Sequence, residues 1–408
     1  MQNQKLFHEV EQLKAEMVEA LMALIRLPAI GPENGGDGEF RKAEKLTQIL
    51  EEADFDKIER YDAEDLRVSS GKRPNIIAYY YGETDARRLW IVTHMDVVPP
   101  GEESMWTVTK PFEPLLKDNR VYGRGSEDNG QSLIASFFAV KALKRLGVKP
   151  KRTVALAFVA DEEQGSRLGI QHLIGKGLFG KGDLVVVPDS GNEAGSFIEI
   201  TEKSILWLRI RTVGKQTHAS LPNKGLNAHR VGMQVALALD KMLHEKYSLK
   251  NDQFDVPEST FEPTRKDKNV NAVNIIPGED IAYFDCRILP NYNVDEILAE
   301  INRVTEEFEK KTGATIELEV LQRQVAPELK DGNSEIVALL KKAIKDARGL
   351  DAKVGGIGGG TCAAFFRKIG IPAVVWSSVD EVAHQPNEYA KIENMINDAK
   401  IFAVLAIR

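Results

Sequence analysis

Three short apolar segments, each followed directly by histidine or acidic side chains, constrain the fold of this chain more than any other feature. They cover residues 89–93, 154–160 and 184–187. Segments this short and this apolar are typical of strands that are buried on both faces. A helical pattern at 133–146 separates the first two strands. The alternation of strand and helix therefore predicts an α/β domain with a mostly parallel sheet.

A change of pattern near residue 204 indicates a second domain. Residues 205–211 alternate apolar and basic side chains, as a half-exposed strand does. The patterns that follow predict helices at 227–244 and 294–312 and strands at 281–289 and 315–321. These elements form an α+β unit of roughly 120 residues, which is large enough to fold as a domain. We expect one α/β domain, 1–203 and 325–408, interrupted by an inserted α+β domain at 204–324.

Composition excludes several classes of function. The 408 residues include 61 acidic and 54 basic side chains, a formal charge of −7, whereas nucleic-acid binders usually carry a basic face. The chain lacks the run of about 18 apolar residues that a membrane span needs, and its polar N-terminus does not resemble a signal peptide. Two cysteines are too few for a disulfide framework or a cysteine-rich zinc site. We expect a cytoplasmic enzyme with no nucleic-acid or membrane partner.

The side chains that follow the three strands suit a metal site. His94 and Asp96 are two residues apart, so they lie on the same side of the chain, where Asp96 could orient a metal-bound imidazole. Glu162 and Glu163 follow the second strand, and adjacent carboxylates repel each other unless a positive charge lies beside them. One of the two could bind metal while the other acts as a general base. Asp189 follows the third strand.

Two further candidates lie in loops. Asp128 ends a glycine-rich turn before a helix, where capping that helix is the alternative interpretation. His384 follows a predicted strand at 374–376. In open α/β sheets, sites form at the carboxyl ends of strands, so we expect these side chains to meet there. Two histidines, two aspartates and a glutamate suit zinc, cobalt or manganese, with enough oxygen for a carboxylate that bridges two ions.

These motifs resemble those of the di-zinc metallopeptidase family that includes aminoacylase, acetylornithine deacetylase, succinyl-diaminopimelate desuccinylase and the glutamate carboxypeptidases. The segments that carry the resemblance are His94-Met95-Asp96-Val97-Val98-Pro99, Trp106, Pro111-Phe112, Gly123-Arg124-Gly125 with Asp128, Glu162-Glu163, Asp189 and His384. The resemblance implies a metal-binding α/β catalytic domain with an inserted α+β domain that serves as a lid and a dimerisation domain. It also implies a homodimer.

The resemblance implies two divalent metal ions per chain, zinc in the first place, with cobalt or manganese as alternatives. His94 and Asp189 would bind one ion. Glu163 and His384 would bind the other, and Asp128 would bridge the two.

The resemblance also implies three catalytic roles. Asp96 would orient its neighbouring histidine, and Glu162 would be the general base. His218, in the segment Gly214–Ser220, would stabilise the tetrahedral oxyanion. In dimeric members of the family this histidine comes from the partner subunit.

Further matches concern the substrate. Asn274 and Arg287 lie in segments that resemble the family's substrate-holding lid segments. The planar guanidinium of Arg287 suits a carboxylate, and a salt bridge within the lid is the alternative. The N–H groups of Gly359, Gly360 and Thr361, before a predicted helix, could bind an anionic substrate terminus, unless they form only a tight turn.

The expected function is metal-dependent hydrolysis of the amide bond of a small N-acyl amino acid or peptide with a free carboxylate. Desuccinylase-like deacylation is one form, and dipeptidase or carboxypeptidase activity is the alternative, because the ligand set is shared. A catalytically silent amino-acid-binding relative would have lost a ligand or the base, and none is lost. Asn129, Gly130 and Gln131 depart from the family's pattern after Asp128, and Asp189 replaces the glutamate of the desuccinylase. Both weigh against the desuccinylase subgroup in particular.

Overall fold

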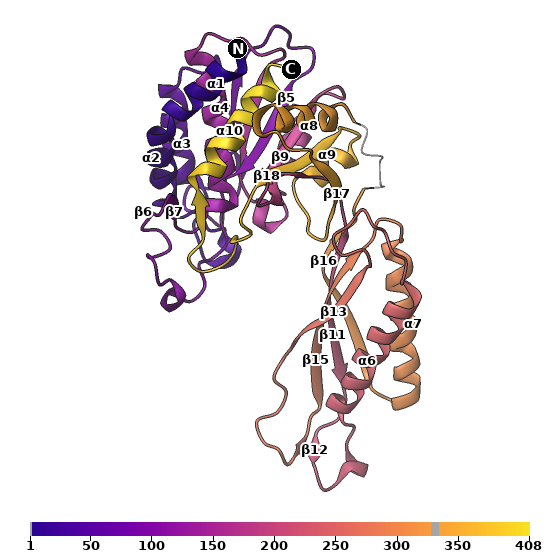
Figure 1. Cartoon of the computed structure of the whole chain (residues 1–408). Helices are drawn as coiled ribbons and strands as arrows, with labels where there is room; N and C mark the ends of the chain where they lie inside the picture. The colour runs from indigo at the N-terminus through magenta and orange to yellow at the C-terminus, as the bar shows by residue number, and fades with distance from the viewer. Residues whose placement is uncertain (1, 328–333) are drawn as a thin grey trace. The chain divides into compact units, whose positions relative to one another are not determined.

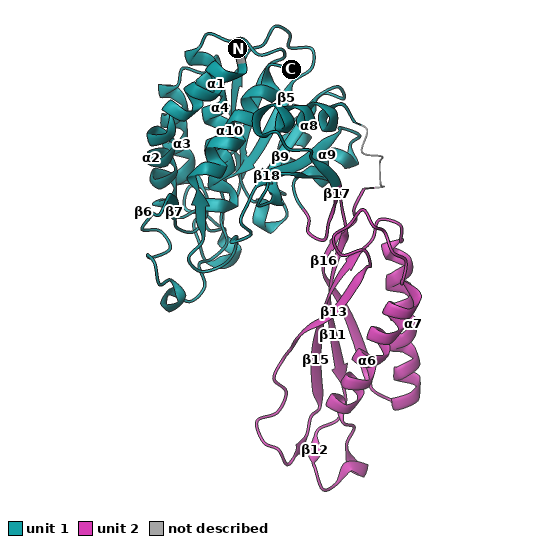
Figure 2. Cartoon of the chain, viewed as in Figure 1, with its two compact units in different colours: residues 1–200, 331–354, 361–408 teal, residues 201–330, 355–360 magenta. Residues whose placement is uncertain are grey.

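The chain contains two units, which Figure 2 colours separately. A computed structural model describes residues 2–327 and 334–408. Unit 1 consists of residues 1–200, 331–354 and 361–408, and unit 2 of residues 201–330 and 355–360. Residues 355–360, which the sequence assigned to the first domain, join unit 2 because Ile357 accepts a hydrogen bond from the Lys203 N–H and Gly356 donates to Gln253. Residues 328–333, part of the expected segment 325–408, lie outside the described residues.

Among the residues that the structure describes, unit 1 contains a sheet of eight strands. The strands lie in the order β1 (Lys57–Arg60), β4 (Ile76–Tyr80), β8 (Val154–Val159), β5 (Leu89–His94), β9 (Leu184–Asn192), β18 (Ala373–Ser378), β10 (Phe197–Glu202) and β17 (Lys353–Ile357). The central strands β8, β5, β9 and β18 are parallel to one another, whereas β1 with β4, β4 with β8, and β10 with β18 pair antiparallel. The α/β fold class is confirmed, and the sheet as a whole is mixed. The apolar pattern detected the central strands, whose apolar segments are buried and which are the parallel ones.

Helices cover both faces of this sheet (Figure 1). The helices of unit 1 are α1 (Gln2–Gln12), α2 (Lys14–Ile25), α3 (Phe40–Glu52), α4 (Ser132–Arg145), α5 (Ile170–Gly175), α8 (Glu335–Arg348), α9 (Ala363–Lys368) and α10 (Ile392–Ala406). In β5, Leu89 and Ile91 join the core that contains α4 and α10, and Trp90 and Val92 join the core that contains α9. Across residues 2–327 and 334–408, no helix has both the length and the apolar character needed to cross a membrane.

Short strands complete unit 1. They are β2 (Ala63–Glu64), β3 (Lys72–Arg73), β6 (Leu115–Lys117), β7 (Arg120–Tyr122) and β19 (Tyr389–Lys391). β19 pairs with β7, which lies directly before the glycine-rich turn of Asp128. This pairing joins the last part of the chain to the segment that carries a predicted metal ligand.

Unit 2 is a four-stranded antiparallel sheet with two long helices. The strands lie in the order β13 (Thr260–Lys266), β15 (Glu279–Ile288), β11 (Ser204–Val213) and β16 (Thr315–Gln324), the helices are α6 (Ala228–Lys246) and α7 (Val294–Thr312), and β12 (Thr217–His218) pairs with β14 (Ile275–Ile276). Leu206, Leu208 and Ile210 of β11 enter the core formed with both helices, whereas Trp207 between them is exposed. This alternation is the one expected from the sequence. β13 was not expected, because Pro263 and several charged residues hide its strand character.

A buried carboxylate attaches α10 to the end of β18. Asp398 accepts hydrogen bonds from the Ser378 N–H at 2.9 Å and from the Ser378 hydroxyl at 2.6 Å. Burial raises the pKa of Asp398 to about 7. Because β18 leads into the loop of His384, this contact fixes where that loop begins.

Replacing Asp398 by Asn is expected to change the pH dependence of stability. The folded-state pKa of about 7 lies above the ordinary value of 3.8, so the folded protein binds this proton more tightly than the unfolded chain does. The resulting stabilisation is complete below about pH 4 and is lost as the pH rises to about 7. D398N has no such titration. The difference in Tm, variant minus wild type, should therefore increase over this interval and level off above it. Both proteins would be measured in chelator, and a constant difference would contradict the prediction.

Candidate metal centre

The carboxyl ends of three parallel strands bring the predicted ligands together. β5 ends at His94, β8 is followed by a short helical turn, Glu162–Gln164, and β9 contains Asp189 near its end. Since β8, β5 and β9 are parallel neighbours, these ends meet at one edge of the sheet. The strand order thus explains why residues about 100 positions apart share one site.

Asp128 lies between the two histidines. One of its carboxylate oxygens is 2.9 Å from His94 Nε2, and the other is 2.9 Å from His384 Nε2. His94 Nε2 is also 3.2 Å from Asp189, and His384 Nε2 is 3.3 Å from Glu163. Asp128 therefore contacts a His–Asp pair with one oxygen and a His–Glu pair with the other, as a bridging carboxylate would.

The spacing of the ligand atoms suits metal ions. Ligand atoms of His94, Asp128 and Glu163 lie within 4.8 Å of one another, and so do those of His94, Glu162 and Asp189. Distance alone therefore does not separate Glu162 from the ligands. Its interpretation as the base depends on the pairing around Asp128, which leaves Glu162 outside both pairs.

The charges at the site also fit divalent cations. Burial and the neighbouring Asp189 raise the pKa of Glu162 well above its ordinary value. Burial and Asp128 raise the pKa of Glu163 to about 7, and hydrogen bonds with Asp128 and Glu163 raise the pKa of His384 to about 10. A divalent cation would offset the mutual repulsion of these crowded carboxylates. The mixture of imidazole nitrogen and carboxylate oxygen is a donor set that zinc and similar ions use.

Asp96 holds the turn that carries the two glutamates. Its carboxylate accepts hydrogen bonds from the Glu162 N–H at 3.1 Å and the Glu163 N–H at 3.0 Å. The Nδ1 atom of His94 lies 3.0 Å from the main-chain oxygen of Asp96 and 3.6 Å from its carboxylate. The residue therefore contacts His94 mainly through its backbone and positions Glu162 and Glu163 through its side chain.

The other predicted residues lie mostly in unit 2. His218 is exposed on β12, where its Nδ1 atom is 2.8 Å from the Ser220 hydroxyl. Ala219 donates a hydrogen bond to the main-chain oxygen of Asn274 at 2.9 Å. The structure thus brings His218 and Asn274 together on the ribbon formed by β12 and β14.

Arg287 is engaged within unit 2. Its guanidinium binds the Asp285 carboxylate with two hydrogen bonds of 2.6 and 2.9 Å and donates to the Gly358 oxygen at 3.2 Å. The salt bridge that the sequence left open as the alternative is present. Gly359 and Gly360 belong to unit 2, whereas the Thr361 hydroxyl of unit 1 accepts a hydrogen bond from Ala363 at the start of α9.

Three residues of the site were missed by the sequence reasoning. Asn129 donates to Asp189 at 2.9 Å and to the Pro188 oxygen at 2.8 Å. Glu127 and Glu388 are buried, and each accepts several main-chain hydrogen bonds. The sequence does contain a signal at Glu127. It is adjacent to Asp128, and two adjacent carboxylates repel each other unless hydrogen-bond donors or positive charges lie beside them.

Comparison with known proteins agrees with this geometry. Residues 90–408 match the family model described as Peptidase family M20/M25/M40. The chain belongs to this family. It is 40% identical over 395 residues to an uncharacterized metallohydrolase of Methanocaldococcus jannaschii, covering 93% of this chain and 96% of that protein. It is 27% identical over 385 residues to the succinyl-diaminopimelate desuccinylase of Nitratiruptor sp., covering 93% and 96%.

A solved structure shows the same fold. Human carnosine dipeptidase 1 superposes with a TM-score of 0.78 at 16% identity, covering 100% of this chain and 98% of that one. At this identity the likeness concerns the fold alone. The family match and the relative of Methanocaldococcus jannaschii make this protein an M20 family metallohydrolase.

Replacing Asp128 by Ala is expected to reduce the number of bound ions. The wild type should hold two Zn²⁺ per chain after dialysis, and D128A at most one, because the carboxylate shared by both histidines is lost. Each bound ion stabilises the fold by about 2.7 kcal/mol when free metal is about 100-fold above its Kd. Adding Zn²⁺ to chelator-treated protein should therefore raise the Tm more for the wild type. Elemental analysis and calorimetry check this, and two ions in D128A would exclude a bridging role.

Proposed function

We propose that this M20 metallohydrolase cleaves the amide bond of a small N-acyl amino acid or short peptide that has a free carboxylate. The observation that carries the proposal is the contact of Asp128 with both the His94–Asp189 pair and the Glu163–His384 pair. Two divalent ions, zinc with cobalt or manganese as alternatives, would supply Lewis acidity to the scissile carbonyl and acidify water. The enzyme would act in the cytoplasm.

Glu162 is the residue that moves the proton. Burial raises its proton affinity, so its carboxylate can take a proton from the attacking water and keep it until the leaving nitrogen accepts it. The hydrogen bond from its N–H to Asp96 fixes the backbone from which the side chain extends. Asp96 therefore supports catalysis by positioning the base.

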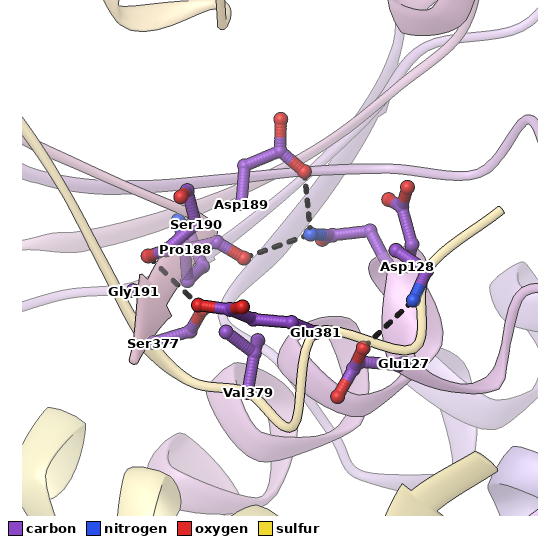
Figure 3. A pocket seen from close by; sticks show the side chains of 11 residues that line it. Glu127, Asp128, Pro188, Asp189, Ser190, Gly191, Ser377, Val379 and Glu381 are labelled. Atoms are coloured by element: carbon purple, nitrogen blue, oxygen red, sulfur yellow. Dashed lines mark hydrogen bonds between the residues drawn. The ribbon is translucent and has the colours of Figure 1, made fainter. Parts of the chain in front are cut away.

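A cavity beside the acids supports a small substrate. It has a volume of about 280 Å³, and Asp128, Asp189 and Ser190 are among the residues that line it (Figure 3). This volume lies just below the roughly 300–1,000 Å³ typical of ligand sites. It suits an amino-acid-sized group better than a long peptide.

Residues of unit 2, together with Thr361 of unit 1, would stabilise the oxyanion and hold the substrate. His218 would stabilise the oxyanion, and because its Nδ1 atom contacts the Ser220 hydroxyl, Nε2 is the ring atom that would do so. Arg287 and Asn274, with the N–H groups of Gly359, Gly360 and Thr361, hold the substrate. Since Arg287 already binds Asp285, the substrate carboxylate must replace or share this partner. By resemblance to dimeric members, the protein forms a homodimer through unit 2.

Dipeptidase activity is the second candidate. Glu381 also lines the cavity, and its exposed carboxylate would favour a substrate with a free amine over one whose nitrogen is acylated (Figure 3). The Nitratiruptor relative is named a desuccinylase, and the human structural neighbour a dipeptidase. Both substrate types therefore belong in one panel.

Replacing Glu162 by Gln tests the mechanism. E162Q should retain two bound Zn²⁺ ions and lose about 10²- to 10⁴-fold in kcat, the usual contribution of a general acid–base residue. The panel would contain N-acetyl and N-succinyl amino acids and dipeptides. E193Q is the matched control, because Glu193 is an exposed carboxylate of unit 1 that pairs with Lys391. If E162Q keeps parental kcat on the substrate that the wild type cleaves, Glu162 is not the base.

Replacing Arg287 by Gln tests how the substrate is held. R287Q should raise KM about tenfold or more for a carboxylate substrate, since hydrogen bonds to charged groups contribute about 1.5–3 kcal/mol. The KM for the corresponding carboxamide should change little. D285N is the matched control. It releases the Arg287 guanidinium from Asp285, so KM should stay the same or decrease. Equal effects of R287Q on acid and amide would assign Arg287 to the salt bridge alone.

A further inference from the structure

Two loops of unit 1 each hold the other in place. The first, residues 123–129, contains Asp128, and the second, residues 380–388, contains His384. More than 250 residues separate them in the sequence. Each loop supplies one buried carboxylate that binds main-chain N–H groups of the other.

Glu388, in the second loop, binds the first. Its carboxylate accepts hydrogen bonds from the N–H groups of Glu127 at 2.9 Å, Asp128 at 3.0 Å and Gly125 at 2.9 Å. The Arg124 guanidinium donates a fourth bond at 2.7 Å. The side chain of Glu388 is fully buried, so these four donors replace its contacts with water.

Glu127, in the first loop, binds the second. Its carboxylate accepts hydrogen bonds from the N–H groups of Asp380 at 2.6 Å, Val382 at 2.7 Å and Ala383 at 3.0 Å. Ala383 directly precedes His384, whose backbone is left-handed, with φ +62°. Such a conformation costs about 1–3 kcal/mol in a residue other than glycine and persists only where neighbouring contacts impose it. Glu127 supplies such contacts to three of the four residues that precede His384.

Glu388 binds the backbone of Asp128, and Glu127 binds the backbone directly before His384. Asp128 and His384 are the two predicted ligands that contact each other. Asp128 is itself a donor to Glu388, and His384 follows the last donor to Glu127. The Asp128 carboxylate and His384 Nε2 are 2.9 Å apart. Burying two more acids beside an acidic site is unfavourable for stability, and apolar side chains would avoid this cost. The contacts are therefore better explained by the geometry of the ligands than by stability.

We propose that Glu127 and Glu388 are positioning residues that set the distance between Asp128 and His384 and so determine the affinity for the metal ions. The proposal rests on the two-metal site of the proposed function. It predicts different effects for the two residues. Glu127 controls only the loop of His384, whereas Glu388 controls the bridging Asp128.

Replacing Glu127 by Gln is the decisive test. In the wild type, both carboxylate oxygens of Glu127 accept hydrogen bonds from main-chain N–H groups. In E127Q one of these oxygens is replaced by an amide NH₂ group, which cannot accept them, so residues 380–384 should shift. Titration of chelator-treated protein with Zn²⁺ in a calorimeter should show one ion bound with parental Kd. The second should bind about 10- to 100-fold more weakly, as is usual when residues that orient metal ligands are changed. In E388Q, the same measurement should show weaker binding of both ions.

Asp183 provides a matched control. It is a buried carboxylate of unit 1 that accepts hydrogen bonds from the Arg88 and Gly180 N–H groups and from the Trp90 indole, at the opposite end of β9 from Asp189. D183N should lower the Tm and leave both Zn²⁺ affinities unchanged. A general loss of stability, by contrast, would weaken metal binding in all three variants and would overturn the proposal.

Hydrogen exchange without metal gives an independent measurement. Amides of residues 380–383 should exchange faster in E127Q than in the wild type, and amides of residues 125–128 faster in E388Q. If E388Q does not fold, E127Q alone decides. Parental Zn²⁺ affinities in E127Q would refute the proposal. If the wild type binds two ions but hydrolyses nothing in the substrate panel, the proposed function fails while the positioning role remains.

Discussion

Mutual repulsion among half-buried acids is the constraint on which the rest of this structure depends. Asp128, Asp189, Glu162 and Glu163 converge at one edge of the sheet, and burial raises the pKa of both glutamates. A flexible chain would separate such groups. The rigid framework that prevents this is the central part of the sheet, where four parallel strands are packed between helices on both faces.

Main-chain N–H groups hold this acidic site together from outside. Asp96 accepts two of them from the turn of Glu162 and Glu163, Glu388 accepts three from the loop of Asp128, and Glu127 accepts three from the loop of His384. None of these three carboxylates is itself a predicted metal ligand. Each of them fixes the backbone that carries a predicted ligand or the predicted base. Because N–H donors are partial charges at fixed positions, they offset the buried carboxylates without placing an ammonium or guanidinium group among the ligands.

The sequence predicted what is local or periodic. Central strands, long helices and the polar residues after each strand can be recognised from short windows, and the resemblance supplied the ligand pairing. The partners of Glu127 and Glu388 could not be found in this way, because their hydrogen bonds join loops more than 250 residues apart. The sequence left a salt bridge of Arg287 open without naming its partner. Asp285 could have been named, since residues two apart on a strand share a face. β13 was missed because its strand character comes from pairing with β15 rather than from its composition.

The metal centre and the proposed substrate contacts come from different parts of the chain. His94, Asp128, Glu163, Asp189 and His384 all lie in unit 1, whereas His218, Asn274 and Arg287 lie in unit 2, which has its own sheet and core. If the residues of unit 2 hold the substrate as proposed, changes in that unit would alter the substrate without disturbing the ligands of the metal ions. Such a division is consistent with a single ligand set serving relatives named for different substrates. Under the proposed function, the choice between deacylase and dipeptidase would be made by the residues around the substrate, Arg287 and Asn274 of unit 2 and Glu381 of the cavity in unit 1, rather than by the metal ligands.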